Sequence, residues 1–333
     1  MKILVTGATG LMGSILVRRL VREKHHVVIL RRKTADTQEI DDLKISHRLG
    51  DITDPESLKT ALDGCDVIYH TAGLVAQWSG YKDSLYRVNT LGVRHVLEAA
   101  LEQGVKRAVV VSSTAAIGGT RHPEILDERF VFNLEHLPYA HSKWLGEKEA
   151  LAIGKKGIEV VIVNPATTFG PGDKHLNAGM TILNTRDGKI FGFPPGGNTF
   201  VDVEDVVDGM IAAMERGRNL ERYILGNEFL SFQTLLTIIS RIQGKSAPKF
   251  ALPKFLLTLG GWGKEMISRF LLHSEPYPSQ EAVDMSIKFM YCSNNKARRE
   301  LGYNPKVPIE DSIRRAYDWY VKTGFRHNQL SRI

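Results

Sequence analysis

The chain has 333 residues, and its composition, 43% hydrophobic and 24% charged, is that of ordinary globular proteins, which excludes disordered, collagen-like and coiled-coil chains. The net charge of +7 could suit nucleic acid or a membrane surface, yet the basic residues are scattered rather than gathered on one helix, so we expect no nucleic-acid partner. Two cysteines, Cys65 and Cys292, cannot build a disulfide framework, and no apolar run is long enough for a signal peptide or a membrane-spanning helix. These features predict a reducing, cytoplasmic location.

Short apolar runs alternate with stretches of helical periodicity through the first half of the chain. Met12, Leu16 and Leu20 share one helical face, and residues 88–101 are similarly periodic. Because parallel strands need crossover connections, the alternation indicates an α/β fold with a doubly wound parallel sheet. The predicted strands are 2–6, 27–30, 45–49, 67–70, 108–112 and 160–163.

The regular alternation ends after Pro165, where segments rich in proline and glycine separate shorter elements. This change predicts a dinucleotide-binding Rossmann domain and a smaller, mostly helical C-terminal substrate lobe. We expect two later strands, 200–203 and 222–225, to return to the main sheet. The predicted boundaries are 1–165 with 200–226 for the first unit, and 166–199 with 227–333 for the second. Within the lobe, segment 255–272 could touch a membrane or form a lid, although ordinary packing is favoured.

A glycine-rich turn links the first predicted strand to the first helix. Gly7, Gly10 and Gly13 have the spacing G-x-x-G-x-x-G, which permits a tight turn, close approach of a pyrophosphate and close packing of helix on strand. The helix N-terminus adds unpaired N–H groups and the positive end of the helix dipole. This context favours a dinucleotide-binding loop over a turn without a ligand.

The second predicted strand ends in two arginines where many dinucleotide-binding proteins have an acid. Arg31 and Arg32 would suit the 2′-phosphate of NADP, and the first acid after them is Asp36. The alternative is a solvated basic loop, with NAD as the cofactor. Asp51 follows the third strand and could accept from the adenine amino group, or it could cap the turn into residues 54–56.

The spacing of Tyr139 and Lys143 indicates acid–base chemistry. Pro138 suits the first turn of a helix, and an i, i+4 spacing places both side chains on one helical face. A neighbouring ammonium favours the phenolate, so we expect it to bring the high pKa of the phenol toward the working range. A hydroxyl cluster at residues 112–114 lies about 25 residues upstream, at the end of the preceding strand.

With these residues the chain resembles the extended short-chain dehydrogenase/reductases, the NAD-dependent epimerase/dehydratase family, over almost its whole length. The motifs that carry the resemblance are Thr6-Gly7 to Gly13, Gly50-Asp51-Ile52, His70-Thr71-Ala72-Gly73, Asn89, Ser112-Ser113-Thr114-Ala115, Tyr139 to Lys143, Asn164-Pro165-Ala166-Thr167 and Leu301-Gly302-Tyr303-Asn304-Pro305.

The resemblance implies specific roles for three catalytic residues. Tyr139 is the general acid/base, Lys143 binds the nicotinamide ribose and tunes Tyr139, and Thr114 holds the substrate oxygen at a position where serine is commoner. Asn89 is implied to support the active-site geometry. The cofactor contacts that we expect are Gly7, Thr9, Gly10, Leu11, Met12, Gly13, Arg31, Arg32, Asp51, Ile52, Thr71, Ala72, Gly73, Asn89, Tyr139, Lys143, Pro165, Ala166 and Thr167.

Departures from the family pattern reduce the number of activities that we expect. Sugar dehydratases carry an acid pair where this chain has Ala115 and Ala116, and sugar epimerases carry an arginine where this chain has Asn198. The arginine-containing turn after the second strand and Trp78 are similar to the dihydroflavonol 4-reductase-like branch, although hopanoid-associated epimerase-like proteins share these features. We therefore expect an NADP-dependent reductase acting on the carbonyl of a small organic substrate.

Two other functions stay open. The first is an epimerase for sugars or nucleotide sugars that retains NAD, and the second is a non-catalytic dinucleotide sensor. No His or Cys spacing matches a zinc site, so we expect no bound metal. The family also makes a homodimer through the helix of Tyr139 possible.

Overall fold

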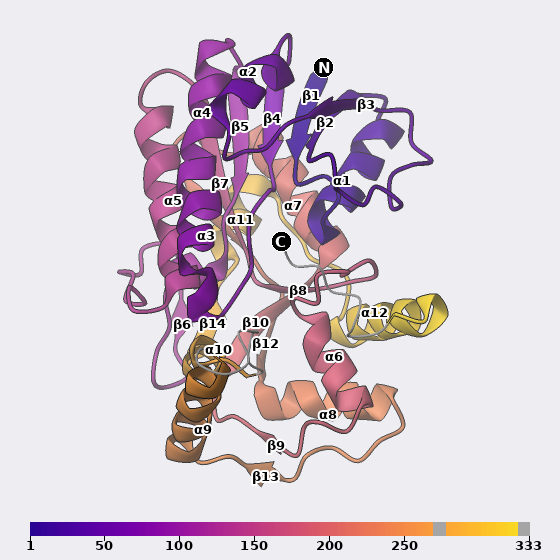
Figure 1. Cartoon of the computed structure of the whole chain (residues 1–333), viewed down its shortest axis with the longest axis vertical. Coiled ribbons are helices and arrows are strands. Elements are labelled where there is room, and N and C mark those ends of the chain that lie inside the picture. Colours follow the sequence, from indigo (N-terminus) through magenta and orange to yellow (C-terminus); the bar gives the residue numbers. More distant parts are fainter. Residues whose placement is uncertain (269–277, 326–333) are drawn as a thin grey trace.

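A parallel sheet of seven strands forms the centre of the protein in the computed structural model, which describes residues 1–268 and 278–325 (Figure 1). Apart from the polar, largely exposed edge strand Ser46–Leu49, the strands are short and mostly apolar and are buried on both faces, as strands of parallel sheets usually are. In spatial order the strands are β11 (Arg222–Leu225), β7 (Glu159–Pro165), β5 (Arg107–Val111), β4 (Val67–His70), β1 (Lys2–Thr6), β2 (His26–Arg31) and β3 (Ser46–Leu49). The predicted doubly wound sheet is confirmed.

Helices cover both faces of this sheet, and the sheet separates two hydrophobic cores. One face packs against α1 (Leu11–Arg22), α7 (Val203–Arg216) and α11 (Asn295–Leu301). The other face packs against α2 (Pro55–Leu62), α4 (Gly92–Glu102) and α5 (Pro138–Gly154). The short helix α3 (Lys82–Tyr86) continues through a π-helical turn, Arg87–Leu91, into α4.

A second, smaller sheet lies beyond the carboxyl ends of the main strands (Figure 1). Its central strand β10 (Gly197–Asp202) pairs with three segments that are far apart in the sequence. The remaining strands are β6 (Ile125–Leu126), β8 (Thr167–Phe169), β12 (Glu228–Ser231) and β14 (Phe289–Cys292), and β9 (Gly192–Phe193) pairs separately with β13 (Phe250–Ala251). The lobe helices are α6 (Gly179–Arg186), α8 (Phe232–Ile242), α9 (Lys254–Ile267), α10 (Gln280–Ser286) and α12 (Ile309–Thr323).

One strand prediction is wrong. Residues 222–225 join the main sheet beside β7, as expected, but residues 200–202 belong to β10 of the second sheet, and Val203 begins α7. An apolar run predicts a strand without specifying its partners, which here are Thr167–Phe169 and Glu228–Ser231 rather than β7 or β11. The division of the chain into two units at residue 165 stays a prediction.

Two predicted segments extend beyond the residues that the structure describes. In the apolar segment 255–272, residues 269–272 lie outside the described residues. In the predicted second unit, which runs to residue 333, the stretch after residue 325 lies outside them as well. In residues 1–268 and 278–325 no helix has the length and apolar character needed to cross a bilayer.

Candidate active site

The carboxyl ends of the main strands open onto a cavity of about 2040 Å³, at the edge where doubly wound sheets bind their ligands. Of the residues predicted for the site, the cavity is lined by all except Asn89. The cavity continues from the glycine-rich turn to the lobe, where α6, α8, α9 and α10 contribute to its wall.

The turn between β1 and α1 is shaped by steric limits at two glycines. Gly7 has φ +69°, and a Cβ on it would lie 2.5 Å from the backbone nitrogen of Ala72. A Cβ on Gly13 would lie 2.1 Å from the carbonyl oxygen of Gly7, so α1 could not pack so closely against the turn. Gly10, the N-cap residue of α1, offers no side chain to the first N–H groups of the helix. These groups therefore remain available to an anion such as a pyrophosphate.

Arg31 and Arg32 line the cavity at the end of β2, and we call this part of its edge the basic rim. Arg31 donates from Nε to His47 Nδ1 at 3.0 Å, whereas the guanidinium of Arg32 has no hydrogen bond or ion pair among the residues that the structure describes. Asp36, the nearest acid in the sequence, is bound by Lys174 Nζ at 2.7 Å, and this hydrogen bond lowers the pKa of the Asp36 carboxyl. The rim therefore presents positive charge.

Asp51 takes part in the turn that leads into residues 54–56, one of the two arrangements considered for it. Its Oδ1 accepts from the backbone nitrogen and the hydroxyl of Thr53, both at 2.8 Å, and Asp54 caps α2. Asp51 also lines the cavity, and its contact with an adenine stays a prediction.

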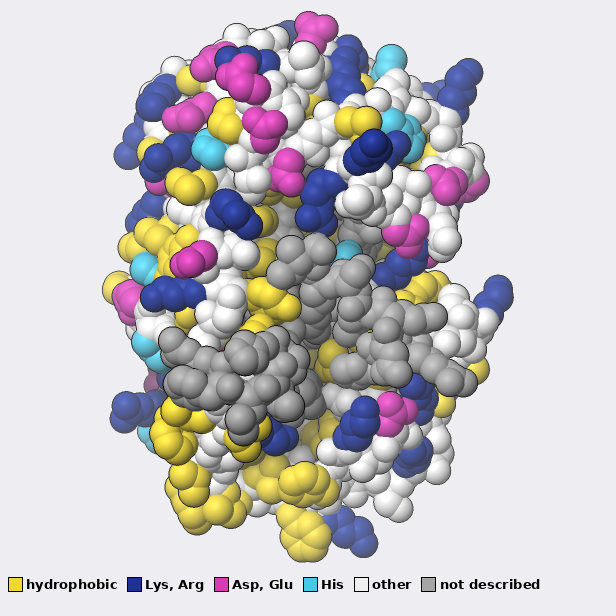
Figure 2. Space-filling model, in the orientation of Figure 1, with side chains coloured by type: hydrophobic (Ala, Val, Ile, Leu, Met, Phe, Trp, Pro, Cys, Tyr) yellow, Lys and Arg dark blue, Asp and Glu magenta, His cyan; other side chains and the backbone are white. Residues whose placement is uncertain are grey.

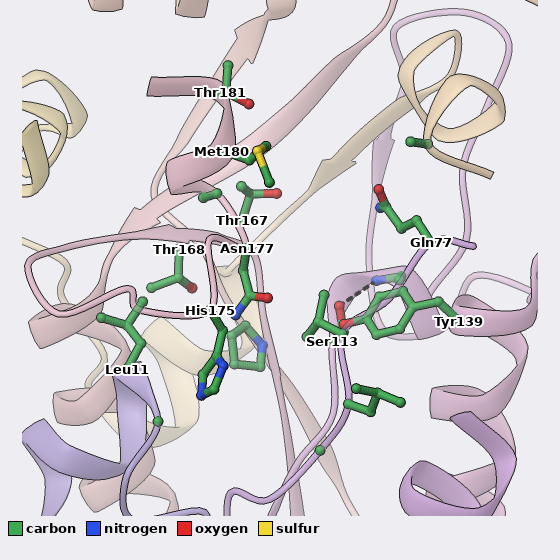
Figure 3. Close-up of a pocket in the computed structure, with 18 of the residues that line it drawn as sticks. Leu11, Gln77, Ser113, Tyr139, Thr167, Thr168, His175, Asn177, Met180 and Thr181 are labelled. Carbon is green, nitrogen blue, oxygen red and sulfur yellow. Dashed lines mark hydrogen bonds between the residues drawn. The ribbon is translucent and has the colours of Figure 1, made fainter. Parts of the chain in front are cut away.

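The buried phenol of Tyr139 faces the cavity from the first turn of α5 (Figure 3). Burial raises its pKa, and a hydrogen bond with the Ser113 hydroxyl partly opposes this effect. The expectation that Lys143 would lower the pKa of Tyr139 is therefore not met, because desolvation dominates and Lys143 is directed elsewhere. Lys143 Nζ donates to the carbonyl oxygen of Val111 at 2.9 Å, and burial lowers the pKa of its ammonium to about 8 against the opposing charge of Glu147.

The hydroxyl beside the phenol belongs to Ser113, whereas the resemblance placed this role on Thr114. Both residues line the cavity, and Thr114 is buried. Ser113 has extended backbone, with φ −161° and ψ 154°, and its hydroxyl also accepts from the nitrogen of Ala115 at 3.1 Å. Successive side chains alternate in direction along extended backbone, so a shift of one residue decides which hydroxyl meets the phenol.

Asn89 supports the site from behind the cavity wall. Its Oδ1 accepts from the nitrogen of Leu74 at 2.8 Å, and its Nδ2 donates to the carbonyl of Leu74 at 2.9 Å and to the hydroxyl of Ser142 at 3.0 Å. Asn89 thus joins the segment after β4 to α5, which matches the implied supporting role. Asn89 is not among the residues that line the cavity, and its contact with the cofactor stays a prediction.

Other residues at the site could not be predicted from motifs. His175 and Asn177, from the loop before α6, lie across the cavity from Tyr139 and Ser113 (Figure 3). Glu281 of α10 accepts a hydrogen bond from the backbone of Tyr139. None of these residues stands in a pattern that single-sequence analysis connects with Tyr139. In the described part of the chain no group of three His, Cys, Asp or Glu side chains is arranged to hold a metal.

Comparisons with known proteins show the family of this chain. The model of the NAD dependent epimerase/dehydratase family matches residues 3–226. A putative dihydroflavonol 4-reductase of Synechocystis sp. is 34% identical over 98% of this chain and 96% of its own, and sterol demethylase protein B of Methylococcus capsulatus is 31% identical over 97% and 99%. The crystal structure of gox2253 has a TM-score of 0.84 and 34% identity, covering 97% of this chain and 98% of its own. This chain belongs to the NAD-dependent epimerase/dehydratase family of NAD(P)-dependent enzymes, the extended short-chain dehydrogenase/reductases.

Proposed function

We propose that the protein reduces the carbonyl group of a small organic substrate with NADPH. The observation that carries the proposal is the buried Tyr139 phenol, held in its protonated form and facing the cavity beside the Ser113 hydroxyl. A reduction needs a proton donor at neutral pH, and a phenol with a raised pKa keeps its proton until the carbonyl oxygen gains charge. The opposite reaction, oxidation of an alcohol, would need the phenolate.

The chain's residues fit the nicotinamide cofactor. The uncapped N-terminus of α1 and the glycine turn would hold the pyrophosphate, and the missing Cβ of Gly13 lets α1 pack closely against that turn. Arg31 and Arg32 would hold a 2′-phosphate, which favours NADP over NAD. When bound, NADPH supplies the hydride for the carbonyl carbon. Tyr139 then donates its proton to the carbonyl oxygen, which the hydroxyls of Ser113 and Thr114 orient.

The names of the relatives support a reductase of an apolar substrate. Besides the putative dihydroflavonol 4-reductase, a 2-alkyl-3-oxoalkanoate reductase of Stenotrophomonas maltophilia is 27% identical over 95% of this chain. A nucleoside-diphosphate-sugar epimerase of Pseudomonas aeruginosa, 25% identical with a TM-score of 0.79, keeps an epimerase as the second candidate. Free, buried thiols at Cys65 and Cys292 support a cytoplasmic location. A homodimer through α5 stays a prediction.

The decisive experiment follows NADPH absorbance with a panel of ketones and aldehydes, and in parallel with nucleotide sugars. We expect NADPH oxidation that depends on an organic carbonyl compound. Protein that purifies with NAD bound and interconverts nucleotide sugars, with no carbonyl reduction, would replace the reductase with the epimerase.

A further inference from the structure

Helix α9 presents a stripe of large apolar side chains to the outside of the molecule. Phe255, Leu259, Trp262 and Met266 follow one another at intervals of four, three and four residues, so they share one helical face. Their exposed fractions are 68%, 62%, 58% and 38%. Single exposed apolar residues are common on protein surfaces, but a contiguous group usually marks a surface that binds something.

The apolar surface continues onto the neighbouring strand pair. Phe191, just before β9, is 78% exposed, and Phe250 of β13 is 73% exposed. The register pairs Phe250 with Gly192, so Phe191 adjoins in sequence the residue paired with Phe250 at this end of the lobe. Figure 2 shows hydrophobic side chains, in yellow, gathered at the lower end of the molecule over α9 and the β9–β13 pair. We call this surface, formed by Phe191, Phe250, Phe255, Leu259, Trp262 and Met266, the α9 face.

Positive charge accompanies the α9 face. The stretch 245–268 contains four lysines and one acidic residue, Glu265, whose carboxylate accepts a hydrogen bond from the Ser79 hydroxyl. Lys249 and Lys254 are exposed directly beside Phe250 and Phe255. Lysine stems can lie along an apolar surface while their ammonium groups reach a charged layer above it. This arrangement is complementary to a surface that is apolar below a negatively charged layer.

The inner side of the same helix forms part of the cavity wall. Leu257, Gly260 and Gly261 line the cavity, and so do Leu256 and Phe191, which are at least half exposed. The cavity therefore reaches the surface at the edge of the α9 face. A molecule or membrane that covers the α9 face would therefore lie next to the opening of the cavity.

We infer that the α9 face docks the protein on the surface of a bilayer that contains anionic lipids. Tryptophan and phenylalanine favour the boundary between headgroups and acyl chains, and a helix with such a face lies in the plane of that boundary. Lysines beside it add attraction to anionic headgroups. A second copy of the chain fits less well, since a two-fold contact would bring the lysines of both copies together. The inference does not depend on the proposed reductase activity.

The test is co-sedimentation of the full chain with vesicles of phosphatidylcholine alone, or of phosphatidylcholine with phosphatidylglycerol. We expect wild-type protein to sediment with the anionic vesicles and to be released by salt. The double variant Leu259→Ser, Trp262→Ser should bind about tenfold more weakly or worse, because two large apolar side chains no longer leave water. Lys249→Gln with Lys254→Gln should reduce binding to the anionic vesicles roughly tenfold or more. Val131→Ser, at a residue that is 83% exposed elsewhere, serves as the matched control and should bind like the wild type.

Two outcomes would overturn the inference. In the first, wild-type protein stays in the supernatant with both vesicle types. In the second, the Leu259→Ser, Trp262→Ser variant sediments like the wild type. A dimer in light scattering that the same variant disrupts, without vesicle binding, would assign the α9 face to a second copy. Circular dichroism and NADPH affinity, both expected to be unchanged in every variant, show that the variants are folded and keep the outcome separate from the reductase proposal.

Discussion

The carboxylate of Glu281 accepts a hydrogen bond from the backbone N–H of Tyr139, with 2.9 Å between Oε1 and the nitrogen. The two residues are 142 positions apart in the sequence. Glu281 is buried, and among the described residues its Oε2 has no hydrogen-bond partner. This hydrogen bond ties α10 to the first turn of α5, the turn that carries the Tyr139 phenol. Gln77 Nε2 adds a second link to α10 through the sulfur of Met285 at 3.2 Å.

The burial of Glu281 predicts a pH-dependent contribution to stability. Burial raises the pKa of its carboxyl to about 7, and the nearby Asp284 and Glu265 act in the same direction. A group with a raised pKa in the folded state stabilises most below its unfolded pKa, and this contribution is lost as the pH rises to the folded value. Between about pH 4.5 and 7 the free energy of unfolding of the wild type should fall by about 3 kcal/mol relative to Glu281→Gln, which cannot titrate.

Urea unfolding of both proteins at pH 5 and pH 8 measures this difference. Glu102→Gln, at an exposed position on α4, is the control. The difference between its free energy of unfolding and that of the wild type should be the same at both pH values. A constant difference between wild type and Glu281→Gln across this range would contradict the prediction.

Replacement of Tyr139 by Phe tests the proton donor. The variant keeps the ring and its packing but has no proton to donate, so turnover should fall by roughly a hundredfold or more. NADPH affinity should hardly change, because the phenol is not its main contact. Steady-state kinetics and a cofactor titration measure the two quantities. Tyr86→Phe is the control. It removes a hydroxyl that is hydrogen-bonded to His141, which lies on α5 like Tyr139, and it should keep most of the turnover. Near wild-type turnover in Tyr139→Phe would remove Tyr139 from the mechanism.

The two neighbouring hydroxyls can be distinguished by paired variants. Because Ser113 is the hydroxyl bonded to the Tyr139 phenol, Ser113→Ala should lower turnover by about tenfold or more, with little change in NADPH affinity. Thr114→Val keeps the volume of the buried side chain and should lower turnover less than Ser113→Ala does. Comparison of kcat for the two variants shows which hydroxyl assists the reaction. A larger loss in Thr114→Val would restore the role that the family resemblance implies for Thr114.

The cofactor preference should follow the charge of Arg32. A charge-assisted contact with a 2′-phosphate contributes about 1.5–3 kcal/mol, so we expect NADPH to bind roughly ten- to a hundredfold more tightly than NADH. Arg32→Asp should weaken NADPH strongly and NADH little. Titration of both cofactors into wild type and variant gives the ratios, with Arg298→Asp as an exposed charge-reversal control. Equal affinities in the wild type would favour the epimerase that retains NAD.

Sequence analysis recovered the main sheet because its information is local. Most strands of that sheet are buried apolar runs, and the neighbouring helices carry one apolar face, so residues 2–6 or 67–70 can be recognised without knowing their partners. The second sheet could not be predicted in this way. Phe200 lies in a similar apolar run, but its strand is completed by Thr167–Phe169 and Glu228–Ser231, and no local pattern encodes these pairings.

The same distinction applies to the site. The glycine turn, Tyr139 and Lys143 are short motifs on single elements, and the cavity contains them all. Two features depended on three-dimensional detail instead. Whether Ser113 or Thr114 meets the phenol depends on backbone direction at the end of β5, and the hydrogen bond from Tyr139 to Glu281 joins residues far apart in the chain.

The pairing of β10 also sets an order in which the protein can assemble during its synthesis. The main sheet has all of its strands once residue 225 has been made, whereas β10 needs β14, which ends at Cys292. A ribosome adds about 5–20 residues per second and domains generally fold as units, so several seconds separate the two events. The glycine turn and the basic rim therefore belong to a part of the chain that can fold first. The predicted contacts of the cofactor, which end at Thr167, have therefore all been synthesised before the strand that completes the second sheet.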